Sequence, residues 1–323
     1  MKALLGKHWF LAVLLGGVAL AWFEPQWLRP ATQRLEPRAV VALALFLMAW
    51  TLESRSLFTV LARPLPALWA AIISYGPLPA LGLCAGWLLP DADLRIGLLL
   101  ITAVPCTLAS AVLWTRLAGG SEATALLVIL LTTATSWLVT TAWLAFATGT
   151  AAALDAATLM RSLVLVLVLP VGIGQIARSR PRLRAPADRL KPAFSVVSRL
   201  LILCIILKAA VDVSDRLSAG SVPLSLGALA FTAVLCAAIH LVALVTGLVS
   251  SRLLRFDYPT QIAVAFSCSQ KTLPVALYVF DAYFLNSYPL AIVPPVFYHV
   301  GQLLMDTLIA ERLAHGHHTN PTR

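Results

Sequence analysis

The chain has 323 residues, of which 60% are hydrophobic and only 12% charged, and its mean hydropathy is +0.88. Long uncharged runs recur from end to end, which excludes a soluble globular domain and predicts an all-α polytopic membrane protein. The formal net charge of +10 does not indicate a nucleic-acid partner, because the basic residues gather in short connectors between apolar segments. The five cysteines lie within apolar runs and lack metal-ligand spacing, so we expect free thiols and no metal or other cofactor.

Ten transmembrane helices fit the hydropathy pattern. The first five are expected at residues 4–22, 39–52, 65–89, 94–117 and 122–147. The second five are expected at residues 159–177, 193–211, 223–250, 258–283 and 289–310. The start of the chain also resembles a secretory signal peptide, but a first membrane span explains it more simply. The histidine-rich end, 315–318, is expected to be disordered.

The basic residues indicate the orientation of the spans. The strongest signal is the connector after span six, which contains Arg178, Arg180, Arg182, Arg184, Arg189 and Lys191. If that connector is cytoplasmic, fifteen basic residues fall in inside segments and five in outside loops. This distribution predicts a multi-pass protein of the inner (plasma) membrane with both termini in the cytoplasm.

The two halves of the chain, 1–150 and 151–323, look alike. Each half holds five spans, and the fourth span of each contains a proline inside a run of small and polar residues, Pro105 and Pro274. Because five is odd, the second half enters the membrane from the opposite face, which predicts two inverted repeats with broken, crossing helices four and nine. Half-helix N-termini at such a crossing favour an anion, so the pattern is typical of a secondary transporter.

Span nine contains a lysine, Lys271, near its centre. A lysine at this depth costs roughly 2.5–3.5 kcal/mol on insertion scales, so it is expected to face the bundle interior or a cavity. Snorkelling, a purely structural bond to a carbonyl and a Schiff-base role are the alternatives. The neighbouring residues are candidates for ion or substrate binding, with bonding to their own helix as the alternative: Ser267, Cys268, Ser269, Gln270 and Thr272.

Further candidates lie after the first break and in span ten. Thr107 and Ser110 follow Pro105, where they either cap the next half-helix or bind an anionic group. His299 and Gln302 in span ten are three residues apart and share a helix face, so they either line a cavity or bond neighbouring backbone. Cys106 and Cys268 occupy related places in the two halves, where packing is the simpler role. Asp306, one turn beyond Gln302, is a minor candidate for a proton relay.

Four stretches of the chain resemble the bile acid:sodium symporter superfamily, and within it the SBF-like branch that contains the seventh member of solute carrier family 10. They are residues 45–52, residues 104–122, residues 269–274 and residues 298–302. The resemblance implies a panel of spans one, two, six and seven and a core of spans three to five and eight to ten. It also implies that a small organic anion binds between panel and core and is carried by alternating access.

One departure from the family concerns sodium. Sodium-coupled relatives place a glutamate in span nine and a Ser-Asn pair after the break in span four. In this chain Cys268 or Ser269 corresponds to the glutamate, and Ala111-Val112 corresponds to the Ser-Asn pair. These residues are poor sodium ligands because oxygen donors are missing. We therefore expect sodium-independent transport, with the Lys271 ammonium in place of the cation. Protons are a possible coupling ion, because a buried lysine can titrate.

Two alternative functions stay open at this point: a sodium-coupled symporter, and a non-transporting membrane sensor on the same fold. The sequence holds no P-loop, metal-protease motif or nucleophile elbow, so we do not expect an enzyme. The identity of the substrate, the direction of transport and the oligomeric state do not follow from the sequence.

Overall fold

The computed structural model describes residues 23–52, 60–108, 110–148, 155–218 and 225–319, with isolated positions between 13 and 21. All regular elements in these ranges are helices, which confirms the all-helical prediction. Seven helices within the described ranges are long and apolar enough to cross a membrane, so a polytopic membrane protein is also confirmed. The first expected span, 4–22, lies mostly outside the described residues, and the count of ten therefore stays a prediction.

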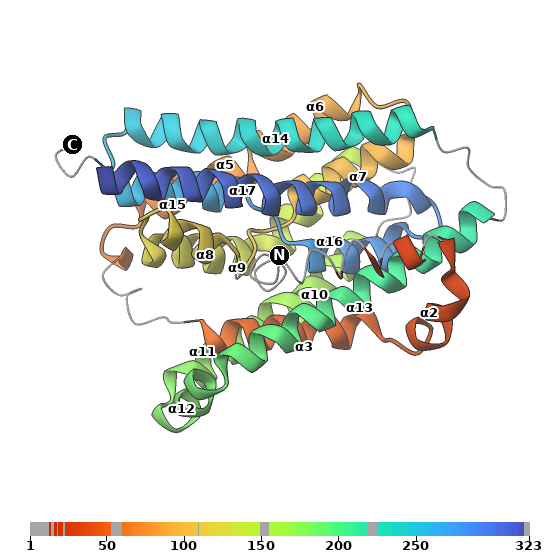
Figure 1. Ribbon diagram of the computed structural model, residues 1–323, viewed down its shortest axis with the longest axis horizontal. Helices are drawn as coiled ribbons and strands as arrows, with labels where there is room; N and C mark the ends of the chain where they lie inside the picture. The colour runs from red at the N-terminus through yellow and green to blue at the C-terminus, as the bar shows by residue number, and fades with distance from the viewer. Residues whose placement is uncertain are drawn as a thin grey trace.

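The helices form two layers, and the thinner one runs along the lower part of Figure 1. The thin layer holds α2 (Pro25–Thr32), α3 (Pro37–Thr51), α10 (Ala156–Leu163), η1 (Val164–Val168), α11 (Leu169–Ser179), α12 (Pro181–Arg189) and α13 (Lys191–Ser218). Gly174 of α11 allows the closest approach in this layer, because a Cβ there would lie 2.8 Å from the Phe46 carbonyl oxygen. The α3 and α11 backbones are therefore in direct contact.

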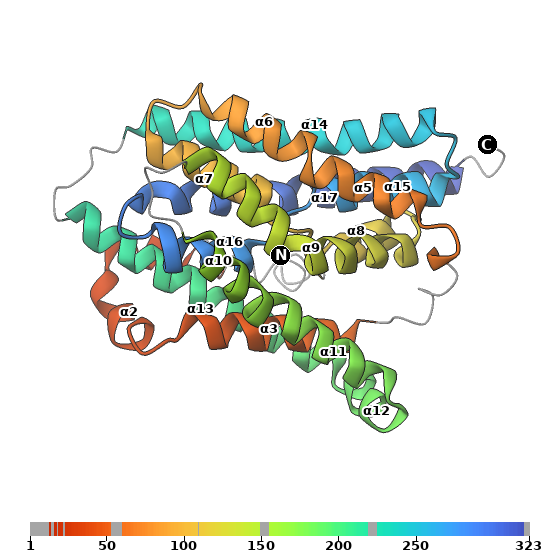
Figure 2. The same cartoon turned by 180° about the vertical axis from the view of Figure 1, so that it is seen from behind.

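The thick layer holds the remaining helices, and Figure 2 shows it from the opposite side. Its elements are α5 (Leu65–Tyr75), α6 (Pro77–Gly86), α7 (Ala92–Ala103), α8 (Ser110–Leu117), α9 (Glu122–Thr148), α14 (Leu226–Leu253), α15 (Tyr258–Ser269), α16 (Leu273–Val279), η2 (Phe280–Phe284), η3 (Pro289–Ile292) and α17 (Val293–Thr319). Every residue from 262 to 280 is buried, so α15 and α16 form the centre of this layer.

Three spans are interrupted, each next to a proline. Span four breaks between α7 and α8, where Val104 is extended (ψ 161°) because a residue before proline avoids the helical region. Span nine breaks at residues 270–272, and Pro274 then lies in the first turn of α16, where its missing N–H costs nothing. Span three breaks at Gly76, before Pro77, and the sequence reasoning did not anticipate this third break.

The structure adds a helix to one connector and overturns one expectation about the end of the chain. The arginine-rich connector contains a short helix, α12, which starts at Pro181, a residue suited to a first helical turn. The histidine-rich end was expected to be disordered, but α17 continues through Thr319. A long terminal helix does not need apolar residues in its last turns once a buried segment has nucleated it.

Asp91 and Asp155 start helices at the end of the molecule opposite α12. Asp91 accepts a hydrogen bond from the Asp93 backbone N–H and caps α7. Asp155 caps α10 by accepting from the Ala157 and Thr158 backbone N–H groups and from the Thr158 hydroxyl. The hydrogen bonds from Thr158 hold the pKa of Asp155 below its ordinary value.

Candidate functional site

The breaks in spans four and nine touch each other. The backbone N–H of Thr272 donates to the carbonyl oxygen of Pro105 at 3.1 Å, so each unwound segment satisfies a group of the other. Backbone that leaves a helix inside a membrane needs such internal partners, because lipid supplies none. Both segments are buried, which makes this contact the junction of the thick layer.

The Lys271 side chain joins this junction to the break in span three. Its Nζ donates to the Ser74 carbonyl oxygen at 2.7 Å, to Ser74 Oγ at 2.9 Å and to the Val104 carbonyl oxygen at 2.9 Å. Ser74 and Val104 both end helices at breaks, so their carbonyls lack the helical donor they would otherwise have. The Tyr75 ring also lies 5.3 Å from Nζ. The ammonium therefore binds oxygen atoms released by two broken helices.

Gln302 of α17 holds the backbone of Lys271. Its Oε1 accepts from the Lys271 N–H, and its Nε2 donates to the Lys271 carbonyl oxygen, both at 3.0 Å. The same Nε2 lies 3.0 Å from Nδ1 of His299. Since Gln302 is fully buried, this side-chain amide replaces the helical hydrogen bonds that the break removes.

Replacing Gln302 with leucine is expected to destabilise the fold by roughly 2–4 kcal/mol, because it strands one buried N–H and one buried carbonyl. Q302E keeps an acceptor for the Lys271 N–H but places a buried carboxyl group against the Lys271 carbonyl oxygen, so it should also be less stable than the wild type. Thermal unfolding in detergent measures both variants. Wild-type stability in Q302L would contradict this role of the amide.

A second buried network extends from the junction to α14. Ser110 Oγ donates to Gln270 Oε1 at 2.8 Å, and Gln270 Nε2 donates to one carboxylate oxygen of Asp306. The other carboxylate oxygen of Asp306 lies 2.8 Å from Nε2 of His240, and both side chains are fully buried. Ser110 Oγ also lies 3.3 Å from Thr107 Oγ1.

A cavity of about 950 Å³ lies between the two layers, at the end of the molecule that carries α12. The thin layer contributes the end of α3 and the first half of α13, and the thick layer contributes α8, the start of α9 and part of α17. Three of the sequence candidates line it: Thr107, Ser110 and His299. The wall also includes the basic residues Arg116, Lys191 and Arg199 and the hydroxyl residues Thr51, Ser121, Ser195, Ser198 and Thr307.

At the opposite end, polar contacts join the layers. Lys208 of α13 lies 2.9 Å from Asp281 of η2 and 2.7 Å from Asp212 of its own helix. Tyr283 of η2 donates to Ser162 of α10 at 3.0 Å. The Lys208 ammonium pairs with one carboxylate of each layer. The layers are thus bridged at one end and separated by the cavity at the other.

The remaining candidates near the two breaks bond mainly to backbone groups, and one has no partner among the described residues. Ser269 Oγ bonds the Ala265 and Phe266 carbonyls of its own helix, which is the local alternative considered above. The Cys106 and Cys268 thiols are free and donate to backbone carbonyls. The Ser267 hydroxyl is buried and has no hydrogen-bond partner among the described residues. Thr272 contributes its backbone to the junction.

Sequence reasoning missed Ser74, Tyr75, His240 and Tyr298. Ser74 and Tyr75 precede Gly76-Pro77, a helix-breaking pair that could have marked them. His240 is a lone ionisable residue in an otherwise apolar span, which is itself a signal of function. Tyr298 donates to the Ser269 carbonyl at 2.7 Å, and no feature of the sequence distinguishes it from a core tyrosine.

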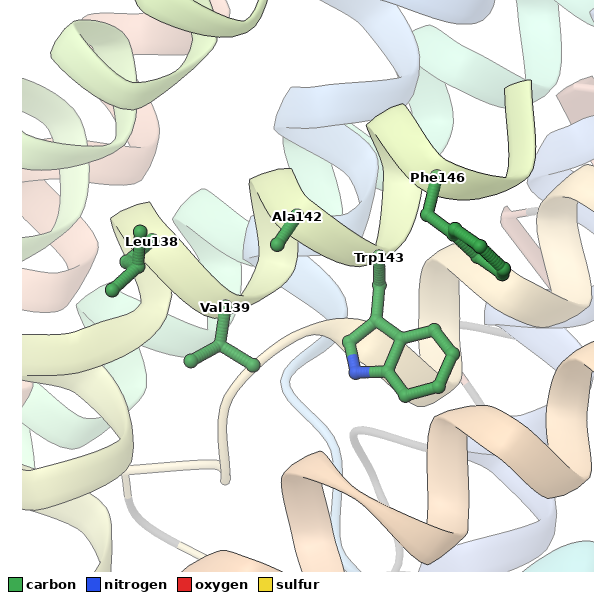
Figure 3. Close-up of a pocket in the computed structure, with 5 residues that line it drawn as sticks. All are labelled: Leu138, Val139, Ala142, Trp143 and Phe146. Atoms are coloured by element: carbon green, nitrogen blue, oxygen red, sulfur yellow. The ribbon is translucent and has the colours of Figure 1, made fainter. Parts of the chain in front are cut away.

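A second hollow, of about 370 Å³, lies on the outer face of α9. Figure 3 shows its lining, Leu138, Val139, Ala142, Trp143 and Phe146. All five come from one helix and are apolar, and Phe146 is 74% exposed. A surface of this kind suits lipid chains, so this hollow is not the candidate site.

Comparison with known proteins agrees with this geometry. The profile of the SBF-like CPA transporter family (DUF4137) matches residues 8–315. The chain belongs to this family. The resemblance inferred from the four sequence stretches is thereby confirmed. The family is one of transporters and not of enzymes, as the sequence predicted.

Two curated relatives of this SBF-like chain illustrate the family. The chain is 29% identical over 226 residues to a probable sodium/metabolite cotransporter, BASS4, chloroplastic, from Oryza sativa subsp. indica, covering 66% of the chain and 53% of the relative. It is 27% identical over 217 residues to sodium/bile acid cotransporter 7 from Danio rerio, covering 66% and 63%. The chain spans about half to two thirds of the length of these relatives.

Proposed function

We propose that this SBF-like protein is a secondary transporter of a small organic anion that works by alternating access. The thin layer acts as the panel and the thick layer as the core. The observation that supports this most is the cavity of about 950 Å³ between the layers, which reaches the broken-helix region at Thr107 and Ser110. A pocket of this size accommodates a small metabolite.

The cavity wall favours an anion. Three basic residues line it: Lys191 and Arg199 of α13, and Arg116, which lies 3.8 Å from Glu122. The Ser198 hydroxyl is buried in the wall and has no hydrogen-bond partner among the described residues, so a ligand can supply one. Opposite α13, the first turn of α8 begins at Ser110, and a helix start carries partial positive charge.

Lys271 takes the place of a sodium ion in this proposal. Its ammonium binds three oxygen atoms at 2.7–2.9 Å, a type of environment that would otherwise suit a cation. A fixed ammonium cannot dissociate with each cycle, so transport needs no sodium. Lys271 does not line the cavity, and its role is to hold the junction rather than to touch the anion.

The positive-inside rule makes this the cytoplasmic-open state. Lys191 and Pro192 of the cavity wall closely follow α12 and its cluster of arginines, which that rule assigns to the cytoplasm. The bridged end then faces the outside of an inner (plasma) membrane, with both termini inside. The matching breaks in spans four and nine support two inverted repeats, 1–150 and 151–323.

Uptake by proteoliposomes tests the proposal. Radiolabelled mono- and dicarboxylates are offered with sodium or with choline as the only other cation. We expect saturable uptake of at least one acid at equal rates in the two media, and loss of that uptake in R199A. A strict sodium requirement would instead favour the cotransport named for the relatives. Binding of an acid without any uptake would favour a sensor.

A further inference from the structure

His240 and Asp306 form an ionisable pair that the transport scheme above does not use. Both side chains are fully buried in the thick layer, His240 on α14 and Asp306 on α17. Ionisable residues at such depth are expensive, and in membrane proteins they typically mark ion or proton sites. This pair lies outside the Lys271 contacts and behind the cavity wall, since neither residue lines the cavity.

The geometry of the pair requires a bound proton. His240 Nδ1 lies 3.3 Å from the Ser269 carbonyl oxygen, which can only accept, so Nδ1 carries a hydrogen. His240 Nε2 lies 2.8 Å from Asp306 Oδ1, and this contact needs a second proton between the two atoms. If that proton leaves, a nitrogen lone pair faces a carboxylate oxygen, and the two groups repel each other. The observed contacts are those of the proton-loaded form.

The surroundings stabilise the loaded form. Ser269 ends α15, so the carbonyl that faces His240 belongs to the negative end of that helix. Gln270 Nε2 donates to the second oxygen of Asp306. The buried titratable groups on the elements packed around the pair are Cys236 on α14, Cys268 on α15, Tyr278 on α16, Tyr298 and His299 on α17, Tyr75 on α5, and Lys271 and Cys106 at the two breaks. The other titratable side chains described on these elements are partly or fully exposed.

Gln270 links the pair to the cavity. Its amide N–H₂ group donates to Asp306, and its carbonyl oxygen accepts from Ser110 Oγ, which lies in the cavity wall. An anion that recruits the Ser110 hydroxyl withdraws this donor from Gln270 and loosens its hold on Asp306. The proton state of the pair and the occupancy of the cavity therefore act on the same amide side chain.

We propose that His240 and Asp306 form a proton-binding site, and that Gln270 couples its occupancy to the anion cavity at Ser110. The proton site itself stands on the contacts above. Its use as the coupling ion of transport rests on the function proposed in the preceding subsection. The proton then accounts for energy coupling in a protein whose cation position is filled by a lysine.

Nuclear magnetic resonance of the full chain, labelled with ¹⁵N-histidine, tests the proton site. The chain has six histidines, and H240Q identifies the signal of interest. We expect the wild type to show a hydrogen on Nδ1 and a proton shared between Nε2 and the Asp306 carboxyl group, and we expect D306N to lose the shared proton. A wild-type Nε2 that shares no proton, or a D306N variant that still binds this proton, would overturn the proposal.

A matched pair of serine variants tests the coupling. S110A removes the donor to Gln270, whereas S251A removes a buried hydroxyl on α14 that bonds only its own helix at Leu248. At a fixed pH, S110A should change the ratio of the proton-loaded to the proton-free His240–Asp306 pair at least twofold, and S251A should not. Equal ratios in S110A and the wild type would overturn the link through Gln270.

A transport measurement separates this inference from the proposed function. An inward-directed proton gradient should stimulate uptake of the acid identified above, and D306N should lose that stimulation. Stimulation that persists in D306N would overturn proton coupling at this pair. If the wild type takes up no acid at all, the proposed function fails, while the ¹⁵N measurements still decide the proton site.

Discussion

Replacing Lys271 with alanine is expected to destabilise the protein by roughly 3–5 kcal/mol and to abolish uptake. The substitution leaves the Ser74 and Val104 carbonyls without a donor in a fully buried site, and each stranded buried acceptor costs about 1–3 kcal/mol. Thermal unfolding in detergent and proteoliposome uptake measure the two effects. S74A removes only one of the three acceptor atoms, the hydroxyl, and should cost about 1 kcal/mol.

Small cations should restore part of the stability of K271A. The space left by the ammonium is lined by oxygen atoms, so ammonium, methylammonium or sodium can occupy it. Millimolar concentrations of these salts are expected to raise the unfolding temperature of K271A but not that of the wild type. If K271A is as stable as the wild type, or if no cation stabilises it, Lys271 does not act in place of a cation.

Replacing Asp281 with asparagine should shift the protein toward the state that opens at the end opposite α12. The change removes the charge that holds Lys208 of the thin layer to η2 of the thick layer. The pair is largely buried, so the loss is expected to be about 1–2 kcal/mol, or a factor of roughly 5–30 in the ratio of the two states. Hydrogen–deuterium exchange should then rise in η2 and in the facing part of α13.

Asp212 provides the matched control for this effect. It contacts the same ammonium at 2.7 Å but lies on the same helix as Lys208, so D212N removes an equal charge without unlinking the layers. Exchange in η2 should stay close to that of the wild type in D212N. Equal effects of D212N and D281N would show that the loss of a negative charge beside Lys208, and not the loss of the bridge between the layers, controls opening.

The span boundaries were predictable because hydrophobic length and proline position are local properties of the sequence. The predicted spans at 122–147 and 193–211 fall within α9 and α13, and the predicted span at 39–52 extends one residue past the end of α3. The break at Gly76 was missed because Ser74 and Tyr75 give only a weak polar signal in a long apolar run, and the helix-breaking pair Gly76-Pro77 was the stronger indication. The helical end of α17 was missed because its last turns are polar and their composition alone suggested disorder.

The candidate site was only partly predictable from residue types. Lys271 and Gln302 were chosen for their polarity in apolar spans, and the structure places them in contact. Their partners could not be found in this way, since the Ser74 and Val104 carbonyls are backbone atoms that every residue has. The His240–Asp306 contact joins residues 66 positions apart, and only the packing of α14 against α17 brings them together.

The position of the Lys271 acceptors in the chain has a consequence for biosynthesis. Ser74 and Val104 belong to spans three and four, which leave the ribosome long before span nine. When the lysine-bearing segment reaches the membrane, the oxygen atoms that receive its ammonium are already in place. These oxygen atoms therefore reduce the free-energy cost of inserting Lys271 into the membrane. Truncated chains that lack spans three and four should insert span nine poorly.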